Sequence, residues 1–300
     1  MKNASLSILF CILLLLLLLA LQKGDSVKEE PSAKYKREIS VYDTGTKTVT
    51  KMDLEEYVWR CMAREMPASF DKEALKAQAV AVRSYTVRKA AGEKATEHFG
   101  ADVCTDFAHC AAFLNDLSEM DKKTQNIYKE AARETAGEIL TYEGEAAATV
   151  FHAMSSGKTE NAADVWGGSV PYLISVDSTE DKKVSGFETK AEFSWEELFP
   201  LLEISEKSVG KPKMTEGGSV AEITIGGKFF KGTEVRKRLK LRSAAFETKE
   251  TESGLSFTVH GYGHGVGMSQ QGANAYAKQG LTYREILAKY YPKTSISHIF

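Results

Sequence analysis

The sequence predicts an α+β fold, and three observations support that prediction. Helical patterns gather within residues 54–135, and strand patterns follow them from residue 138 onward. Neither a regular strand–helix–strand alternation nor an internal repeat is visible. With 300 residues, 43% of them hydrophobic, the chain is long enough for a sizeable core and for about two domains.

Composition excludes several classes of protein. The chain has 39 Lys and Arg against 41 Asp and Glu, a formal net charge of −2, so binding to nucleic acid through charge alone is not expected. Four cysteines are too few for a disulfide-held scaffold of this length. Together with six histidines, however, they leave room for one metal site.

An apolar segment near the N-terminus predicts a membrane anchor. The sixteen residues from Leu6 to Leu21 contain one serine as their only polar residue. That length lies between a signal peptide and a transmembrane helix, and no small-x-small cleavage pattern follows. We therefore expect an uncleaved single-pass anchor over residues 1–22, with Lys2 inside and the rest of the chain outside the cytoplasm. The charged residues 23–38 would be a tether.

Turn and cap signals predict the elements of the first part of the chain. Two strand-like segments flank Asp43-Thr44-Gly45, which is typical of a hairpin. Asp53 and Glu56 resemble a capping box for a helix that Pro67 ends. The expected strands are 39–42, 47–50, 138–142 and 147–152, and the expected helices are 54–66, 72–91 and 122–135.

The second part of the chain is expected to contain an inserted subdomain. A long Gly- and Ser-containing loop leads to residues 166–168, and a mixed pattern follows over residues 185–258. Its expected helices are 195–202 and 233–239, with a strand at 220–225; a strand at 256–259 and a helix at 283–291 follow. The helix-rich core would then consist of residues 39–184 and 259–300 and form a groove. The insert could build one wall of that groove or the interface of a homodimer.

Glu65 ends the apolar face of the first predicted helix. Leu54, Val58, Cys61 and Glu65 follow one another at spacings of 4, 3 and 4, which puts them on one stripe. A carboxyl group in the last turn meets the negative end of the helix dipole and apolar surroundings, and both favour its neutral form. Such a group can donate a proton near neutral pH and accept one back, as cleavage of a glycosidic bond requires. A structural pairing with Arg64 or Arg83 is the alternative.

Five motifs, in this order along the chain, resemble the stage II sporulation protein D family of lytic transglycosylases. They are residues 65–70 (EMPASF), 73–85 (EALKAQAVAVRSY), 151–157 (FHAMSSG), 166–168 (WGG) and 261–270 (GYGHGVGMSQ). The resemblance implies that Glu65 is the catalytic acid/base. It also implies cleavage of the β-1,4 bond between N-acetylmuramic acid and N-acetylglucosamine in peptide-stripped peptidoglycan strands, leaving 1,6-anhydro ends, during engulfment in sporulation. Because the muramic acid C6 hydroxyl attacks C1 in that reaction, a second catalytic carboxylate is not needed.

Two histidines and two cysteines lie close together at residues 98–110. His98, Cys104, His109 and Cys110 offer the ligand types of a tetrahedral zinc site, although their spacing differs from that of a zinc finger. A Cys104–Cys110 disulfide is the alternative outside the cytoplasm, and spacing alone leaves both open. The resemblance implies zinc, because clostridial members of the family have this arrangement. With four protein ligands the ion would be structural.

Further residues in the family-like motifs are candidates for contact with sugar. They are Arg83, Tyr85, Ser155, Ser156, His264 and Gln270. Arg83 could orient Glu65 or an acetamido group of the substrate. The alternating glycines of residues 261–267 lack a nucleotide-binding pattern and are expected to let the backbone approach a ligand or a strand closely.

The resemblance also implies partners and a location. The partners would be the sporulation amidase called stage II protein P and the membrane protein called stage II protein M. The catalytic part would act at the septum between forespore and mother cell. Two other functions remain open: a non-catalytic murein-binding activator of an amidase, which would not need Glu65, and a zinc-dependent cell-wall hydrolase, which would need an open ligand position on the metal.

Overall fold

The computed structural model describes residues 37–92, 98–106 and 109–300. The predicted anchor, residues 1–22, and all but the last two residues of the predicted tether lie outside these ranges. No helix within the described ranges is long and apolar enough to cross a membrane. The described part of the chain is a mixture of helices and small sheets, which confirms the predicted α+β class.

The first elements form as the cap and turn signals predicted. Strands β1 (Glu38–Asp43) and β2 (Thr48–Asp53) pair antiparallel, and the Asp43 carboxylate accepts the N–H of Gly45 in the turn between them. Asp53 caps α2 (Leu54–Glu65) by accepting the N–H of Glu55. The predicted capping box is wrong, because the Glu56 carboxylate instead accepts from Trp59 and Arg60 on its own helix.

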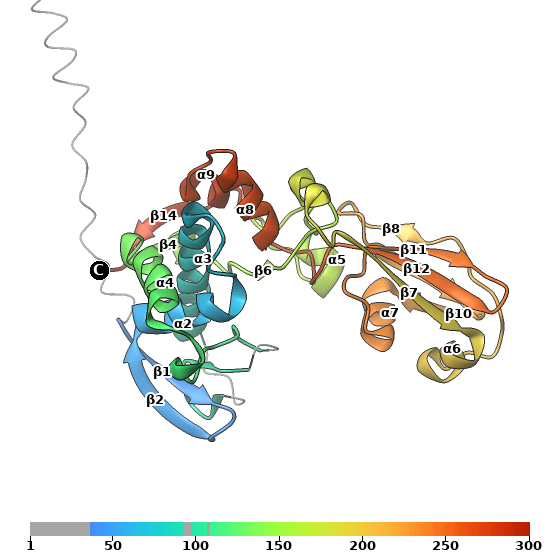
Figure 1. Cartoon of the computed structure of the whole chain (residues 1–300), viewed down its shortest axis with the longest axis horizontal. Helices are drawn as coiled ribbons and strands as arrows, with labels where there is room; N and C mark the ends of the chain where they lie inside the picture. Colours follow the sequence, from blue (N-terminus) through green and yellow to red (C-terminus); the bar gives the residue numbers. More distant parts are fainter. Residues whose placement is uncertain (1–36, 93–97, 107–108) are drawn as a thin grey trace, which may run out of the picture. The chain divides into compact units, whose positions relative to one another are not determined.

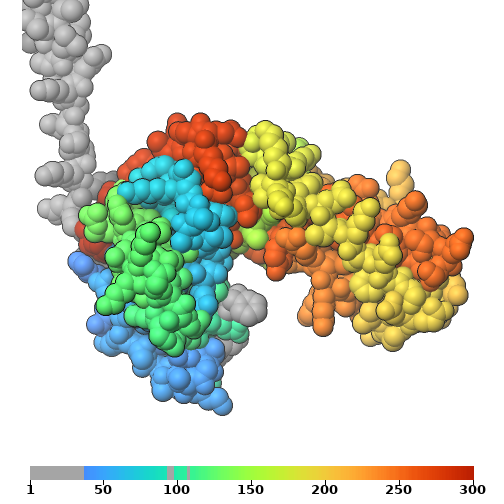
Figure 2. All heavy atoms as spheres, viewed as in Figure 1, coloured from blue at the N-terminus to red at the C-terminus, as the bar shows by residue number. Residues whose placement is uncertain are grey.

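Helix α3 (Lys72–Ala91) lies at the centre of the first core. It contacts α2, α4 (Lys122–Glu134), α8 (Gln270–Lys278) and α9 (Tyr283–Tyr290), as the bundle of ribbons in Figure 1 shows. Its alanines at 74, 77, 79 and 81 are fully buried, and small side chains let neighbouring helices approach closely. In Figure 2 the red C-terminal spheres lie against the cyan ones of α3, and the same hydrophobic core includes Ile39 near the start and Ile299 near the end of the described chain.

Short strands surround these helices. Strand β3 (Val103–Cys104) runs parallel to β1, and β14 (Ser295–His298), β4 (Glu138–Tyr142) and β5 (Glu145–Ala146) form a second sheet. The strand expected over 147–152 is reduced to β6 (Phe151–His152), which pairs with β13 (Met268–Ser269). The backbone N–H groups of Thr149 and Val150 donate hydrogen bonds to carbonyls two residues back. These tight turns keep the backbone from continuing as an extended, paired strand. Helix α5 (Ala162–Trp166) interrupts the loop that follows.

A second hydrophobic core consists entirely of residues between 195 and 259. Its sheets are β11 (Phe246–Glu250), β12 (Gly254–His260) and β7 (Glu188–Ser194), and β10 (Lys228–Lys231), β9 (Val220–Ile225) and β8 (Lys213–Met214). Helices α6 (Trp195–Leu202) and α7 (Gly232–Leu239) cover them. Figure 1 shows these elements gathered together, and we call β7 through β12 the second lobe.

Backbone contacts join the second lobe to the first core. Glu160, which follows β6, accepts the N–H of Ser219 in the turn before β9. Gly263 donates its N–H to the carbonyl of Arg242, and Gly261 donates to Phe187. The loop of residues 261–267 therefore contacts both cores.

Arg83 forms a buried ion pair inside the first core. Its guanidinium is fully buried, lies 2.6 Å and 2.8 Å from the two carboxylate oxygens of Glu55, and also donates to the carbonyl of Glu138. Arg83 thus pairs with Glu55 rather than with Glu65. The interaction ties α2, α3 and the start of β4 together, which is a structural role.

Replacing this arginine should destabilise the fold strongly. Arg83→Met leaves the Glu55 charge without its partner, which costs about 3–5 kcal/mol when the pair is buried. Urea unfolding followed by circular dichroism measures the free energy of unfolding. As a control, Arg64→Met breaks the exposed pair with Glu119 and should cost at most about 1 kcal/mol. Equal losses in the two variants would contradict the structural role of Arg83.

Candidate active site

Glu65 is the last residue of α2, and the chain turns out of the helix immediately after it. Leu54, Val58 and Cys61 on the same stripe are fully buried, as the spacing predicted. Met66 has extended backbone angles, φ −129° and ψ 141°, and is buried against the first core. The carboxyl group of Glu65 is thereby held at the boundary between the core and solvent.

Two donors from distant parts of the chain hold this carboxyl group. The backbone N–H of Ala112 donates to Oε1 at 3.0 Å, and Nε2 of Gln270 lies 3.4 Å from Oε2. Burial raises the pKa of Glu65 above its usual value, and the two hydrogen bonds offset part of that rise. Glu65 therefore tends to keep its proton at higher pH than an exposed glutamate does.

A cavity of about 620 Å³ opens beside Glu65. Among the described residues it is lined by Glu65, Tyr85, His109, Cys110, Ala111, Ala112, Val150, Phe151, His152, Ala153, Trp166, Tyr262, Gly263, His264 and Gln270. Glu65 is the one carboxylate in that lining, which contains no lysine or arginine. Trp166 and Tyr262 are 52% and 48% exposed, so part of each ring is accessible to a ligand, although Arg242 lies over the Tyr262 ring and His264 lies against Trp166.

Two neutral imidazoles form part of the cavity wall. Nδ1 of His152 lies 3.1 Å from the carbonyl of Val266 and must donate to it, whereas Nδ1 of His264 accepts the N–H of Val266 at 3.1 Å. Burial lowers the pKa of His152 to about 3 and that of His264 to about 4. Both rings are therefore uncharged at neutral pH, and Glu65 is the one carboxyl group among the described lining residues.

Glycines with positive φ shape the same wall. Gly263 and Gly267 have φ of 117° and 72°. A Cβ at Gly267 would come within 2.1 Å of the Val150 carbonyl oxygen, and one at Gly263 within 2.7 Å of the His152 Cβ. The predicted close approach of this loop to a strand is confirmed, and it brings Gln270 to Glu65.

The candidate sugar-contacting residues divide into two groups. Tyr85, His264 and Gln270 line the cavity. Arg83, Ser155 and Ser156 are engaged elsewhere: Arg83 with Glu55, Ser155 as a buried donor to Asp181 at 2.6 Å, and Ser156 as a donor to the carbonyl of Gly217. Ser155 and Ser156 thus have structural roles, because each forms a hydrogen bond with a distant part of the chain.

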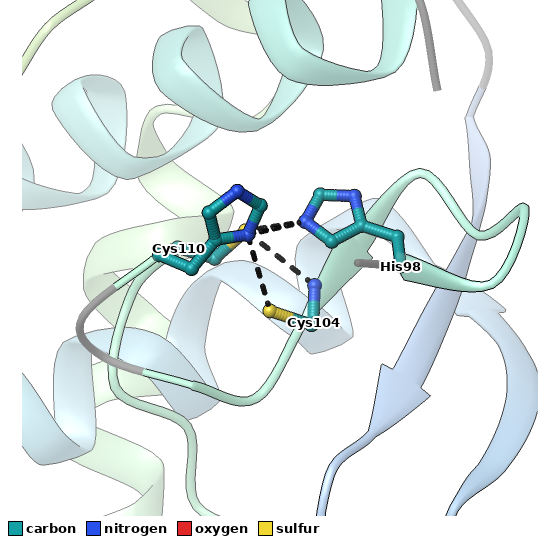
Figure 3. A group of neighbouring side chains, drawn as sticks. His98, Cys104 and Cys110 are labelled. Atoms are coloured by element: carbon teal, nitrogen blue, oxygen red, sulfur yellow. Dashed lines mark hydrogen bonds between the residues drawn. The ribbon is translucent and has the colours of Figure 1, made fainter. Parts of the chain in front are cut away.

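The four predicted metal ligands converge on one point. The ligand atoms of His98, Cys104, His109 and Cys110 all lie within 4.8 Å of one another, and Figure 3 shows His98, Cys104 and Cys110 directed toward a common centre. Both thiols are free, so the structure contains no Cys104–Cys110 disulfide. The distances are 2.8 Å between His98 Nε2 and His109 Nδ1, 3.3 Å between Cys110 Sγ and His98 Nε2, and 3.6 Å between Cys104 Sγ and His109 Nδ1.

This donor set fits a tetrahedral zinc ion. Bond lengths of about 2.0–2.3 Å place neighbouring ligand atoms roughly 3.3–3.8 Å apart. Two sulfur–nitrogen separations, 3.3 Å and 3.6 Å, fall within that range, the Cys110 Sγ–His109 Nδ1 distance of 3.9 Å is slightly longer, and the two imidazole nitrogens are closer. Four protein donors would fill the coordination shell of such an ion.

The ligand cluster is close along the chain to Ala112, one of the two donors to Glu65. Cys110 is followed two residues later by Ala112, the donor to Glu65, and His109 and Cys110 line the cavity themselves. The loop that holds the cluster therefore also presents the N–H that orients the carboxyl group.

Three residues of the site were not predicted from the sequence. Ala112 could not be found, because a backbone N–H leaves no side-chain signal in a sequence. Trp166 and Tyr262 lie in the recognised motifs, but no role was assigned to them.

A cavity with one carboxyl group of raised pKa, neutral hydrogen-bonding groups and partly exposed aromatic rings is suited to chemistry that needs a single acid/base residue. Comparison with known proteins agrees with the motifs. Residues 42–142 match the family model described as stage II sporulation protein. The chain belongs to the stage II sporulation protein D family, whose role is in sporulation.

The relatives align with most of the chain. This chain is 38% identical over 270 residues to stage II sporulation protein D of Bacillus subtilis, and the alignment covers 86% of this chain and 78% of that protein. Identity to the Bacillus amyloliquefaciens protein of the same name is 37% over 283 residues, covering 91% and 80%. An amidase enhancer of Bacillus subtilis is 27% identical over 291 residues, covering 78% of this chain and 39% of that protein.

The hydrogen bond from Gln270 makes a testable contribution to the acidity of Glu65. Gln270→Leu removes a donor to the carboxylate and should raise the pKa of Glu65 further, because the ionised form loses a partner. Carboxyl carbon NMR of labelled glutamate, followed across pH, measures this pKa. Gln271→Leu on the same helix turn is the matched control and should leave it unchanged. A lower pKa in Gln270→Leu would contradict the geometry at Glu65.

Proposed function

We propose that this protein is a peptidoglycan lytic transglycosylase that cleaves the bond between N-acetylmuramic acid and N-acetylglucosamine in glycan strands freed of peptide. The observation that carries the proposal is Glu65, a half-buried carboxyl group of raised pKa in a cavity where it is the one carboxylate among the described lining residues. Membership of the sporulation protein D family supports it.

The proposed reaction needs one carboxyl group and consumes no water. Glu65 donates its proton to the glycosidic oxygen as the bond from that oxygen to C1 of the muramic acid breaks. The C6 hydroxyl oxygen of the same sugar then bonds to C1, and the Glu65 carboxylate takes the hydroxyl proton. The products are a 1,6-anhydro end and a free 4-hydroxyl end, and Glu65 recovers its proton. The exposed faces of Trp166 and Tyr262 are suited to pack against sugar rings.

We further propose that the Cys/His cluster holds one structural zinc ion. His98, Cys104, His109 and Cys110 would be its ligands, and the ion would keep the loop before Ala112 in place. A hydrolytic zinc is disfavoured because four protein donors leave no open position for water. The third function considered from sequence, a zinc-dependent hydrolase, therefore has the weakest support.

The proposal extends to location and partners. Residues 1–22 would anchor the protein in the membrane, with the described part of the chain outside the cytoplasm at the septum. Residues 185–258, which correspond closely to the second lobe, would be the inserted subdomain of the catalytic core. The sporulation amidase, stage II protein P, would supply stripped strands, and stage II protein M would be a membrane partner.

One alternative has an observation in its favour. The similarity to an amidase enhancer suggests a protein that activates a partner amidase without cleaving glycan itself. The two functions differ in their need for Glu65. An activator would keep its effect on the amidase after Glu65 is replaced, whereas the transglycosylase would lose all release of sugars.

Replacing Glu65 should abolish cleavage without unfolding the protein. With peptide-stripped glycan, the protein from residue 37 onward should release fragments with 1,6-anhydro ends, detected by mass spectrometry. Glu65→Gln should lower the rate about 100-fold or more because the proton donor is lost. A carboxyl whose pKa is raised on folding contributes least to stability when ionised, so Glu65→Gln should be no less stable at neutral pH. Fragments from Glu65→Gln at the original rate would contradict the assignment.

The metal proposal predicts both stoichiometry and stability. Mass spectrometry of elements should find about one zinc per chain, and a strong chelator should lower the melting temperature by about 5 °C or more, because bound metal stabilises the folded state. Cys104→Ser should lose the zinc. Cys61→Ala removes a buried thiol outside the cluster and should retain it. A protein without zinc whose melting is unaffected by the chelator would refute a structural metal.

A further inference from the structure

A group of cations lies at the end of α7 and in the residues that follow it. Five of the seven residues from Arg236 to Arg242 are basic. Arg238 is neutralised by Glu234 and Glu203, at 2.9 Å and 3.3 Å. Arg236 and Arg242 form no ion pair with a carboxylate in the described part of the chain, although both are partly buried. Neither charge is therefore balanced by a carboxylate among the described residues.

Arg242 is held at the edge of the cavity by Tyr262. Its guanidinium carbon lies 4.5 Å from the centre of the Tyr262 ring, and its Nη1 donates to the carbonyl of Gly186 at 3.0 Å. The backbone carbonyl of Arg242 also accepts the N–H of Gly263, a residue of the cavity wall. These contacts fix the position of the guanidinium while most of its N–H groups keep no protein acceptor among the described residues.

Arg236, on α7, interacts electrostatically with residues of the same wall. Its positive charge is close enough to Tyr262 to interact with it and close enough to His264 and His152 to help lower the pKa of both imidazoles. Burial lowers the pKa of Arg236 itself. Partial burial of a guanidinium without a counter-ion is unfavourable, and a bound anion would offset that cost.

Each peptide-free N-acetylmuramic acid of the proposed substrate carries one anion. Cleaving the stem peptide from peptidoglycan breaks the amide at the lactyl group of N-acetylmuramic acid, and water supplies the oxygen that makes a free lactyl carboxylate. In intact strands the same position is a neutral amide, and N-acetylglucosamine has no lactyl group. A carboxylate at this position thus distinguishes stripped muramic acid from both.

We propose that Arg236 and Arg242 form a subsite for the lactyl carboxylate of peptide-free N-acetylmuramic acid. This inference rests on the proposed function for its ligand. Guanidinium groups bind carboxylates through charge-assisted hydrogen bonds, often two at a time. The second lobe would therefore select stripped strands, while Glu65 in the first core performs the chemistry.

Binding measurements on Glu65→Gln protein test the subsite without turnover. Calorimetry would compare three oligosaccharides of equal length: one with free lactyl carboxylates, one with the lactyl groups converted to primary amides, and a chitooligosaccharide. We expect the free acid to bind about tenfold more tightly than the other two. Equal affinity for acid and amide would overturn the proposal.

Variants of the two arginines test whether these residues cause the preference for the free acid. Adding Arg236→Gln and Arg242→Gln should weaken binding of the free acid about tenfold and leave the chitooligosaccharide unchanged. The lysine substitutions at both positions, which keep the charges, should retain part of the preference. Lys237→Gln removes an exposed cation from the same helix and should have little effect. A loss of equal size in Lys237→Gln would attribute the preference to general charge and refute the subsite.

These results are separate from the test of the proposed function. A preference for the free acid that depends on the two arginines supports the subsite even if wild-type protein releases no fragments, in which case the transglycosylase fails alone. Cleavage with equal affinity for acid and amide overturns the subsite and leaves the transglycosylase standing.

Discussion

The site depends on one constraint, the partial burial of a single carboxyl group between two hydrogen-bond donors. Glu65 is brought to the boundary of the core by the length of α2, and Ala112 and Gln270 hold it from segments 47 and 205 residues away in sequence. Burial without a positive partner raises its pKa, and that rise gives a carboxylic acid a proton to donate. A paired arginine would remove this property, and the fold directs Arg83 to Glu55 instead.

Two loops supply the donors, and each is fixed by a different kind of interaction. The loop before Ala112 contains the converging Cys/His ligands, so a bound zinc would stabilise the position of the Ala112 N–H. The loop before Gln270 is held by close backbone packing, in which Gly263 and Gly267 leave room for the strand at residues 150–152. The position of the Glu65 carboxyl group thus depends on the loop with the converging Cys/His side chains on one side and on glycine packing on the other.

Local signals predicted much of this fold, and long-range contacts account for the remainder. The caps and periodicity around residues 54–91 gave the helices, and the stripe ending at Glu65 gave its half-buried position. The capping box failed because Glu56 accepts hydrogen bonds from Trp59 and Arg60 on its own helix, and α8 was not among the expected helices. The pairing of Arg83 with Glu55 and the donation from Ala112 depend on tertiary contacts that no sequence spacing specifies. The role proposed for Arg242 likewise depends on its contact with Tyr262, which sequence spacing does not specify.

Isotope labelling gives the most direct test of the central claim that one carboxyl group moves both protons without water. Peptide-stripped glycan would be cleaved by the protein in water enriched in oxygen-18, and the new ends would be weighed by mass spectrometry. The account predicts 1,6-anhydro ends that contain no oxygen-18, since the C6 hydroxyl supplies the oxygen that bonds to C1. Reducing muramic acid ends carrying one oxygen-18 would establish hydrolysis and contradict it.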